Sequence, residues 1–152
     1  MKRYLYTLLY IYAVLTGCYM FSACDKLPKN GDLDGMWQLL TIEHEGIITD
    51  VKDNQLYLSF QLDLFQLNQR SNNKFFYGYF NNDGKQIIFS QFSDMAEEHP
   101  DAPDNYPIDE DNIGIIEQWG YYALTDTFKI EYLTKNNMTL CSKHARITYR
   151  KF

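Results

Sequence analysis

The chain of 152 residues carries a net charge of −6, with 45% hydrophobic and 22% charged residues, which fits one ordinary globular domain. Because no Lys- or Arg-rich block occurs, the sequence predicts neither nucleic-acid binding nor an electrostatic grip on anionic lipid headgroups. Its three cysteines are too few for a disulfide framework. Aromatic residues make up 16% of the chain, which excludes a disordered acidic protein and indicates many strands.

Residues 1–23 have the composition of a secretory signal. Lys2 and Arg3 form a basic start, residues 5–15 are almost entirely apolar or tyrosyl, and no acidic residue precedes Asp25. This order of a positive region, an apolar region and small residues predicts a signal peptide over residues 1–23. An uncleaved membrane anchor is the alternative, because residues 5–23 approach the roughly 20 apolar residues that a spanning helix needs.

Two cysteines near the end of this segment each follow one apolar and two small residues, the pattern of a bacterial lipoprotein signal. A polar stretch containing Pro and Gly follows Cys24 at once, so residues 24–33 are predicted to be a tether and Cys24 the lipidated residue. Cys18, which precedes apolar residues, is the alternative. Acyl chains contribute about 0.8 kcal/mol per buried CH₂, so several chains on one Cys would hold the domain at a membrane. We therefore expect an exported protein of the bacterial cell envelope that is lipid-anchored in the outer membrane, with the lipid bilayer as a partner. The sequence does not distinguish the periplasmic face of that membrane from the cell surface.

Beyond the tether, the chain consists of one predicted strand after another. Apolar and polar residues alternate with a period of two, which places the apolar set on one face of each strand. Asp83-Gly84 suits the positive φ values of a tight turn and predicts a hairpin. The expected strands are 37–42, 56–67, 74–80, 86–89, 128–132, 138–140 and 145–149. Their spacing is that of an antiparallel meander.

Residues 93–121 interrupt this rhythm. The first half, over 94–107, is polar and punctuated by prolines, which predicts a loop. In the second half, acidic residues at 109–111 precede apolar residues at helical spacing, and Gly120 follows them. These features predict a short helix over 113–119 that packs against an opening or wall of a barrel. The sequence identifies no role for the acidic loop 94–111.

The layout of the whole chain resembles a known family. Gly35-Met36-Trp37 matches the Gly-x-Trp signature of lipocalins, and the closing residues 146–152 place arginines where lipocalins cover that Trp. With the lipoprotein signal and tether, the chain resembles the small lipocalin-like lipoproteins of gut-dwelling Gram-negative bacteria over nearly all of residues 32–152. The resemblance implies an all-β, up-and-down antiparallel barrel of about eight strands with one short inserted helix, over residues 34–152. Members of this group largely lack an assigned activity.

The resemblance also implies a structural signature of Gly35, Trp37 and an arginine over the Trp ring. We assign this role to Arg150, with Arg146 on the same strand face as the alternative. A guanidinium stacked on Trp contributes about 0.5 to 2 kcal/mol and can also cap nearby carbonyls. The simpler alternative is that Trp37 is an ordinary core residue and both arginines face solvent.

No residue pattern indicates catalysis or metal binding. His44, His99 and His144 lack the spacing of a zinc site. Cys141 and His144 are close in sequence, but a nucleophilic Cys needs activation by an oriented base, and an unpaired, half-buried Cys is the simpler interpretation. Residues 109–120 depart from a calcium loop, because their twelfth position is Gly rather than Glu. Acids of residues 101–111 gathered around an ion remain an alternative to a solvated loop. We therefore expect no catalytic residue, no metal, no cofactor and no enzymatic activity.

Two functions fit these observations. In the first, the barrel binds a small apolar or amphipathic ligand, because barrels of this size can enclose one. In the second, side chains fill the barrel, and the domain is a tethered protein-interaction or structural module presenting its acidic loop, Tyr57 or Tyr77. We expect a monomer in either case. The residues expected to line a ligand cavity are Phe60, Leu62, Phe76, Tyr79, Phe89, Trp119, Phe128, Ile130 and Tyr132.

Overall fold

The computed structural model describes residues 29–94 and 106–152. The predicted signal peptide, both candidate lipidation sites, Cys18 and Cys24, and most of the acidic loop lie outside the described residues. The elements are η1 (Gly31–Leu33), β1 (Gly35–His44), β2 (Ile47–Asp50), η2 (Lys52–Asn54), β3 (Leu56–Gln61), β4 (Leu64–Gln69), β5 (Lys74–Asn82), β6 (Gln86–Asp94), β7 (Tyr106–Pro107), η3 (Ile113–Trp119), β8 (Asp126–Leu133), β9 (Asn137–Cys141) and β10 (Ala145–Lys151).

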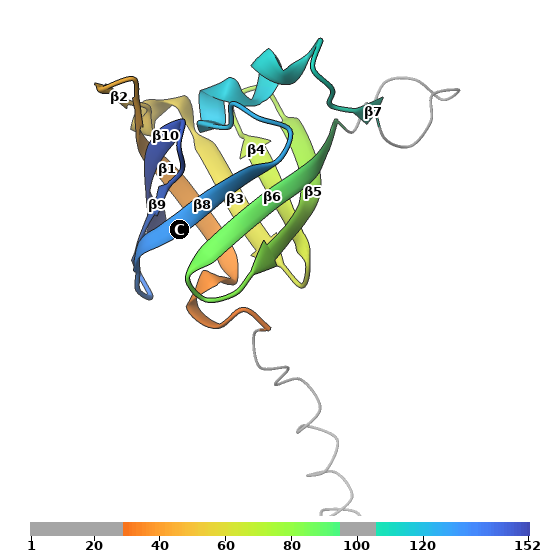
Figure 1. Ribbon diagram of the computed structural model, residues 1–152. Coiled ribbons are helices and arrows are strands. Elements are labelled where there is room, and N and C mark those ends of the chain that lie inside the picture. The colour runs from red at the N-terminus through yellow and green to blue at the C-terminus, as the bar shows by residue number, and fades with distance from the viewer. Residues whose placement is uncertain (1–28, 95–105) are drawn as a thin grey trace, which may run out of the picture.

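Within these two ranges, eight strands close into an antiparallel barrel, shown in Figure 1. Each barrel strand pairs with the next from β3 to β10, and β1 closes the barrel by pairing with both β3 and β10. β2 folds back on the second half of β1, and β7 pairs with the end of β6. The predicted all-β, up-and-down barrel is therefore confirmed.

The two ends of the barrel differ. At the closed end, residues 29–34 lie beside the turn between β3 and β4, where the Asn30 side-chain amide donates to the carbonyl of Leu62. The opposite end, which we call the mouth, carries the hairpin between β1 and β2 together with η3 (Figure 1). The chain that the structure describes thus begins at the end of the barrel opposite the mouth.

One predicted strand is divided in two. The alternation over 56–67 predicts a continuous strand, but the structure turns the chain between β3 and β4. Leu62 adopts a positive φ of 58° at this turn, and Phe60 pairs with Phe65 across it. Because apolar alternation continues through the turn, the sequence pattern hides the reversal.

The predicted helix is present but is a 3₁₀ helix, η3. It ends as expected at Gly120, whose φ of 86° is left-handed and whose N–H donates to the carbonyl of Glu117. The preceding acids form a turn of their own, in which the Asp109 carboxylate accepts from the N–H of Asp111. Among the described residues, no helix has the length and apolar character needed to cross a membrane.

Aromatic side chains fill the barrel interior. The rings of Phe65, Phe89 and Tyr121 meet at its centre, with the Phe89 centroid 5.1 Å from Phe65 and 5.0 Å from Tyr121. Most neighbouring rings meet edge to face, the arrangement that the charge distribution of aromatic rings favours. Gly78 makes room for this cluster, because a Cβ at this position would lie 2.5 Å from the Phe65 ring. The aromatic excess of the sequence thus forms a packed core.

Candidate functional site

Six of the residues expected to line a ligand cavity belong to this packing. Phe60, Phe76, Phe89, Trp119 and Phe128 are buried, and Ile130 is partly buried against them. Phe76 meets Trp119 edge to face at 5.4 Å between ring centroids, and Phe89 meets Phe128 at 5.7 Å. These side chains contact one another, so they pack the interior.

Three of the expected lining residues face outward, which corrects their predicted position. Leu62 is 60% exposed, Tyr79 52% and Tyr132 54%. Leu62 lies in the turn after β3, and Tyr79 is an odd number of residues from inward-facing Phe76, so the two side chains lie on opposite faces of β5. Tyr132 shares its parity with buried Phe128, but a register shift between Ile130 and Tyr132 reverses the faces of β8.

The interior also holds two phenols without conventional partners. The hydroxyls of Tyr121 and Tyr149 are buried, and neither makes a hydrogen bond of normal geometry to any residue that the structure describes. Burial raises the pKa of Tyr121 well above its usual value, and the nearby Tyr149 raises it further. Burial likewise raises the pKa of Tyr149. Both phenols therefore stay neutral while the barrel is folded.

Trp37 closes the barrel opposite the mouth. Its side chain is fully buried and donates from Nε1 to the carbonyl of Leu33 over 2.8 Å. The Lys151 ammonium lies 4.3 Å from the Trp37 ring centroid and donates to the carbonyls of Asp32, at 2.8 Å, and Asp34. Gly35 has a φ of 107°, and a Cβ there would lie 3.2 Å from Lys151 Cε, which explains the glycine of the signature.

The cation over Trp37 is thus Lys151, which corrects the assignment to Arg150. Register decides this, because Trp37 pairs with Lys151 whereas Arg150 pairs with Gln38 and lies on the other face of β10. Arg150 donates from Nε to the Gln38 side-chain oxygen over 2.9 Å. The alternative residue, Arg146, pairs instead with Glu131 at 2.8 Å.

A pocket opens at the mouth between the β1–β2 hairpin and η3. Its volume is about 340 Å³, within the usual range of roughly 300 to 1,000 Å³ for small-molecule sites. The apolar part of its lining comes from Ile42, Ile47 and Val51, of which Ile42 and Val51 belong to the buried core. The other lining residues are His44, Glu45, Thr49, Asn54, Glu117, Gln118 and Tyr122. We call this cavity the mouth pocket.

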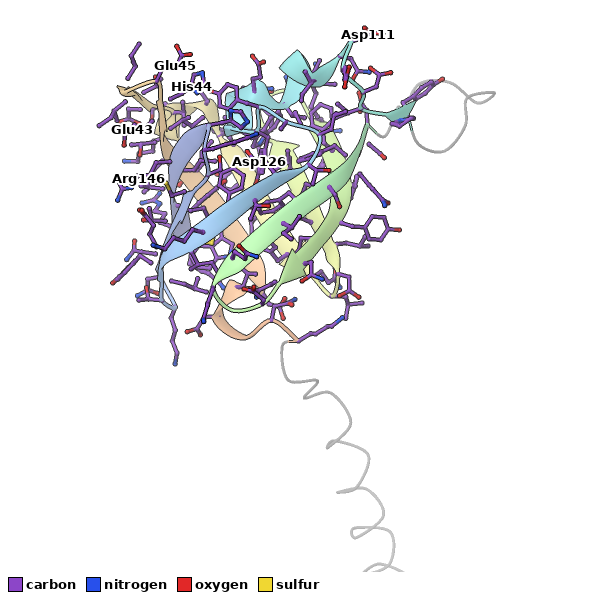
Figure 2. All side chains as sticks on the ribbon, in the orientation of Figure 1. Glu43, His44, Glu45, Asp111, Asp126 and Arg146 are labelled. Atoms are coloured by element: carbon purple, nitrogen blue, oxygen red, sulfur yellow. The ribbon has the colours of Figure 1, made fainter. Side chains whose placement is uncertain are left out.

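His44 and Tyr122 form a rigid aromatic wall of the mouth pocket. Their rings stack at 4.0 Å between centroids with an interplanar angle of 9°. His44 Nδ1 donates to the carbonyl of His144 over 2.7 Å, because a carbonyl only accepts, and this bond fixes the ring orientation. Figure 2 shows His44 and Glu45 at the mouth. Two histidines that are far apart in the sequence therefore meet here.

A second, smaller cleft beside the mouth contains Cys141 and His144. The Cys141 thiol lies 3.7 Å from the carbonyl of Ser142, and burial raises its pKa, with Glu131 raising it further. A thiol with a raised pKa stays protonated and is a poor nucleophile at neutral pH. Across the described ranges, no three His, Cys, Asp or Glu side chains gather closely enough to hold a metal ion.

Sequence reasoning missed the mouth pocket because its residues come from segments without a regular pattern. Ile42 to Asn54 span a hairpin and a 3₁₀ turn, while Glu117 to Tyr122 span the end of η3. One signal in the sequence could have indicated the pocket, namely the pair of adjacent apolar residues Ile47 and Ile48 after Glu45-Gly46. In the structure both isoleucines are exposed at the mouth.

The structure also corrects the prediction for Tyr57. This residue is expected to be an outer docking residue, but its side chain is buried between Arg70 and Phe152.

Comparisons with known proteins agree with this architecture. A family model described as a lipocalin-like domain matches residues 19–152. A lipocalin-like protein from Bacteroides uniformis is 21% identical with a TM-score of 0.56, over 80% of this chain and 100% of its own. An uncharacterized protein from Bacteroides eggerthii is 20% identical with a TM-score of 0.57, over 79% of this chain and 99% of its own. A comparison with curated proteins gives no match.

Proposed function

Because the chain belongs to the family of lipocalin-like domains, we propose that it is a membrane-tethered binding protein for a small apolar or amphipathic ligand. The ligand occupies the mouth pocket and not the barrel interior. We propose no catalytic activity, because burial raises the pKa of the Cys141 thiol and keeps it a poor nucleophile.

The contrast between the filled interior and the mouth pocket carries this proposal. Phe65, Phe89 and Tyr121 contact one another at the centre of the barrel, where a ligand would have to displace them. The mouth pocket has about 340 Å³ and an apolar surface that continues into the core through Ile42 and Val51. Apolar lining with a few convergent polar groups is the usual composition of a ligand site.

The position of the predicted tether supports the membrane part of the proposal. The described chain begins at Lys29, at the closed end, where its ammonium pairs with Asp63. Only four residues separate Cys24 from Lys29, so a lipid on Cys24 would hold the closed end within about 20 Å of the bilayer surface. Exposed Leu62 and Tyr79 lie on that side, on the β3–β4 turn and the end of β5. A barrel anchored in this way in the outer membrane points its mouth away from the lipid.

Blocking the pocket tests the binding function. Thr49 lines the mouth pocket from β2, whereas its neighbour Ile48 is 68% exposed and does not line it. Thr49→Trp fills the pocket from the exposed strand β2, and Ile48→Trp is the matched control. The full chain is purified from its host membrane in mild detergent and compared by native mass spectrometry. We expect an extra mass on the wild type and on Ile48→Trp that is absent from Thr49→Trp.

Two outcomes of this comparison would contradict the proposed binding function. An extra mass retained in full by Thr49→Trp would place the ligand elsewhere, and no extra mass on any of the three proteins would contradict ligand carriage. The anchor is tested separately by labelling with a lipid precursor. Cys24→Ala is expected to abolish lipid labelling, whereas loss of label on Cys18→Ala alone would identify Cys18 as the anchor.

One observation favours the alternative of a protein-interaction module. β2 pairs with β1 on one edge, and among the described residues no strand covers its other edge. Ile47 and Ile48 are both 68% exposed on this short strand. An extended segment of a partner protein can add to such an edge through main-chain hydrogen bonds. Replacing Ile48 by Pro would abolish binding of this kind and leave a ligand in the mouth pocket unaffected.

A further inference from the structure

Two carboxylates flank the mouth pocket from different elements. Glu45 lies in the turn between β1 and β2, and Glu117 lies on η3. Among the described residues that line the pocket, none is Lys or Arg. A separate cleft is lined by the cationic residues Lys143 and Arg146 and also contains Glu43. The charged part of the pocket wall is therefore acidic.

The charges of both carboxylates act on Tyr122 in the aromatic wall of the pocket. Burial raises the pKa of the Tyr122 hydroxyl, and the charges of Glu117 and Glu45 raise it further. The part of this shift that the two carboxylates cause indicates that they place a negative potential at Tyr122. The same potential favours a positive charge on a ligand that lies beside Tyr122.

Hydrogen-bond acceptors also line the mouth pocket. The bond from His44 Nδ1 to the carbonyl of His144 leaves Nε2 of the neutral ring as an acceptor. Asn54 and Gln118, which also line the pocket, each have an amide oxygen that accepts. Together with the two carboxylates, these groups match the several N–H donors of an ammonium group. Ile42, Ile47 and Val51 provide the apolar surface for the rest of the ligand.

We propose that the mouth pocket selects small amphipathic ligands that carry a positively charged amine on an apolar or aromatic body. This selectivity rests on the proposed binding function and assigns the chemical class of its ligand. Neutral analogues bind more weakly because they lose the attraction to Glu45 and Glu117. Anionic analogues bind most weakly because the same carboxylates repel them.

A matched set of indoles tests the charge preference. Tryptamine, tryptophol and indole-3-propionate share one ring system and differ in carrying an ammonium, a hydroxyl or a carboxylate. Each is titrated calorimetrically into the full chain in phosphatidylcholine nanodiscs, with empty nanodiscs as the blank. Tryptamine is expected to bind about three- to tenfold more tightly than tryptophol, the gain that two partly solvated ion pairs supply. Indole-3-propionate is expected to bind more weakly than both.

Two variants test whether Glu45 and Glu117, and not the overall negative charge of the protein, cause the preference for tryptamine. The double variant Glu45→Gln, Glu117→Gln keeps the shape of the pocket and is expected to make tryptamine and tryptophol bind equally. Glu110→Gln removes an exposed charge outside the pocket lining and is expected to retain the preference. Equal binding of tryptamine and tryptophol to the wild type would overturn the charge selectivity while leaving the pocket as a ligand site. Failure of all three indoles to bind would overturn both the selectivity and the proposed function.

Discussion

The lysine that covers Trp37 gives the sharpest test of how this barrel is closed. Lys151→Met keeps the aliphatic stem but removes the ammonium that lies 4.3 Å from the Trp37 ring centroid and donates to the carbonyls of Asp32 and Asp34. The sequence resemblance assigns this role to Arg150, so Arg150→Met is the matched control. The two substitutions therefore distinguish the register seen in the structure from the one that the family resemblance implies.

The magnitude follows from the contacts that are lost. A cation over a Trp ring at a partly exposed site contributes about 1 kcal/mol, and each charge-assisted hydrogen bond contributes about 1.5 kcal/mol. Burial lowers the pKa of Lys151, with Asp32 and Asp34 opposing this shift, so desolvation offsets part of the gain. We expect a net loss of roughly 2 kcal/mol in the free energy of unfolding for Lys151→Met. Arg150→Met loses one part-buried hydrogen bond to the Gln38 side chain and should cost about 1 kcal/mol.

Urea unfolding followed by circular dichroism measures both values under the same conditions. Tryptophan fluorescence provides a second signal, because both tryptophans, Trp37 and Trp119, are fully buried in the folded barrel. The reasoning is refuted if Lys151→Met destabilises no more than Arg150→Met.

Three further outcomes follow from the structure. Gly78→Ala should lower the free energy of unfolding by about 2 kcal/mol or more, because its Cβ would lie 2.5 Å from the Phe65 ring. Urea unfolding measures this loss, and unchanged stability would mean that the Phe65 ring can move aside. Burial raises the pKa of Tyr121 above 10.0, so wild-type stability is fully present below pH 10 and falls as the pH rises further, because the unfolded chain ionises first. Tyr121→Phe should flatten that decline measured by urea unfolding between pH 9 and 11, and an unchanged slope would contradict the burial. The proposed orientation is tested on the lipidated protein bound to vesicles, with an environment-sensitive dye attached at Leu62→Cys or at Ile47→Cys and with Cys141 replaced by Ser in both. The emission of the dye should shift to the blue at position 62, near the membrane, and should not shift at position 47. Equal emission spectra would reject the orientation proposed for the barrel.

Much of the architecture is encoded locally. The alternation in β5, β6, β8 and β10 reflects strands with one face toward the core. Asp83-Gly84 forms the predicted turn, in which the Asp83 carboxylate accepts from the N–H groups of Lys85 and Gln86 over 2.8 and 2.9 Å. Gly120 ends η3 with a left-handed φ, as a glycine after a helix does. Each of these signals depends only on residues that are neighbours in the chain.

Tertiary structure decided which side chains face one another. A shift of one residue in pairing moves a side chain to the other face of a strand, so the bulge in β8 and the register between β1 and β10 put Tyr132 outside and Lys151 over Trp37. The mouth pocket likewise exists only because folding brings His44 against Tyr122, which lie far apart in the sequence. The sequence by itself determined an aromatic all-β barrel with a glycine and a tryptophan at its closed end. Long-range pairing, which no local pattern records, decided that the aromatic residues fill the interior and that the candidate site lies at the mouth.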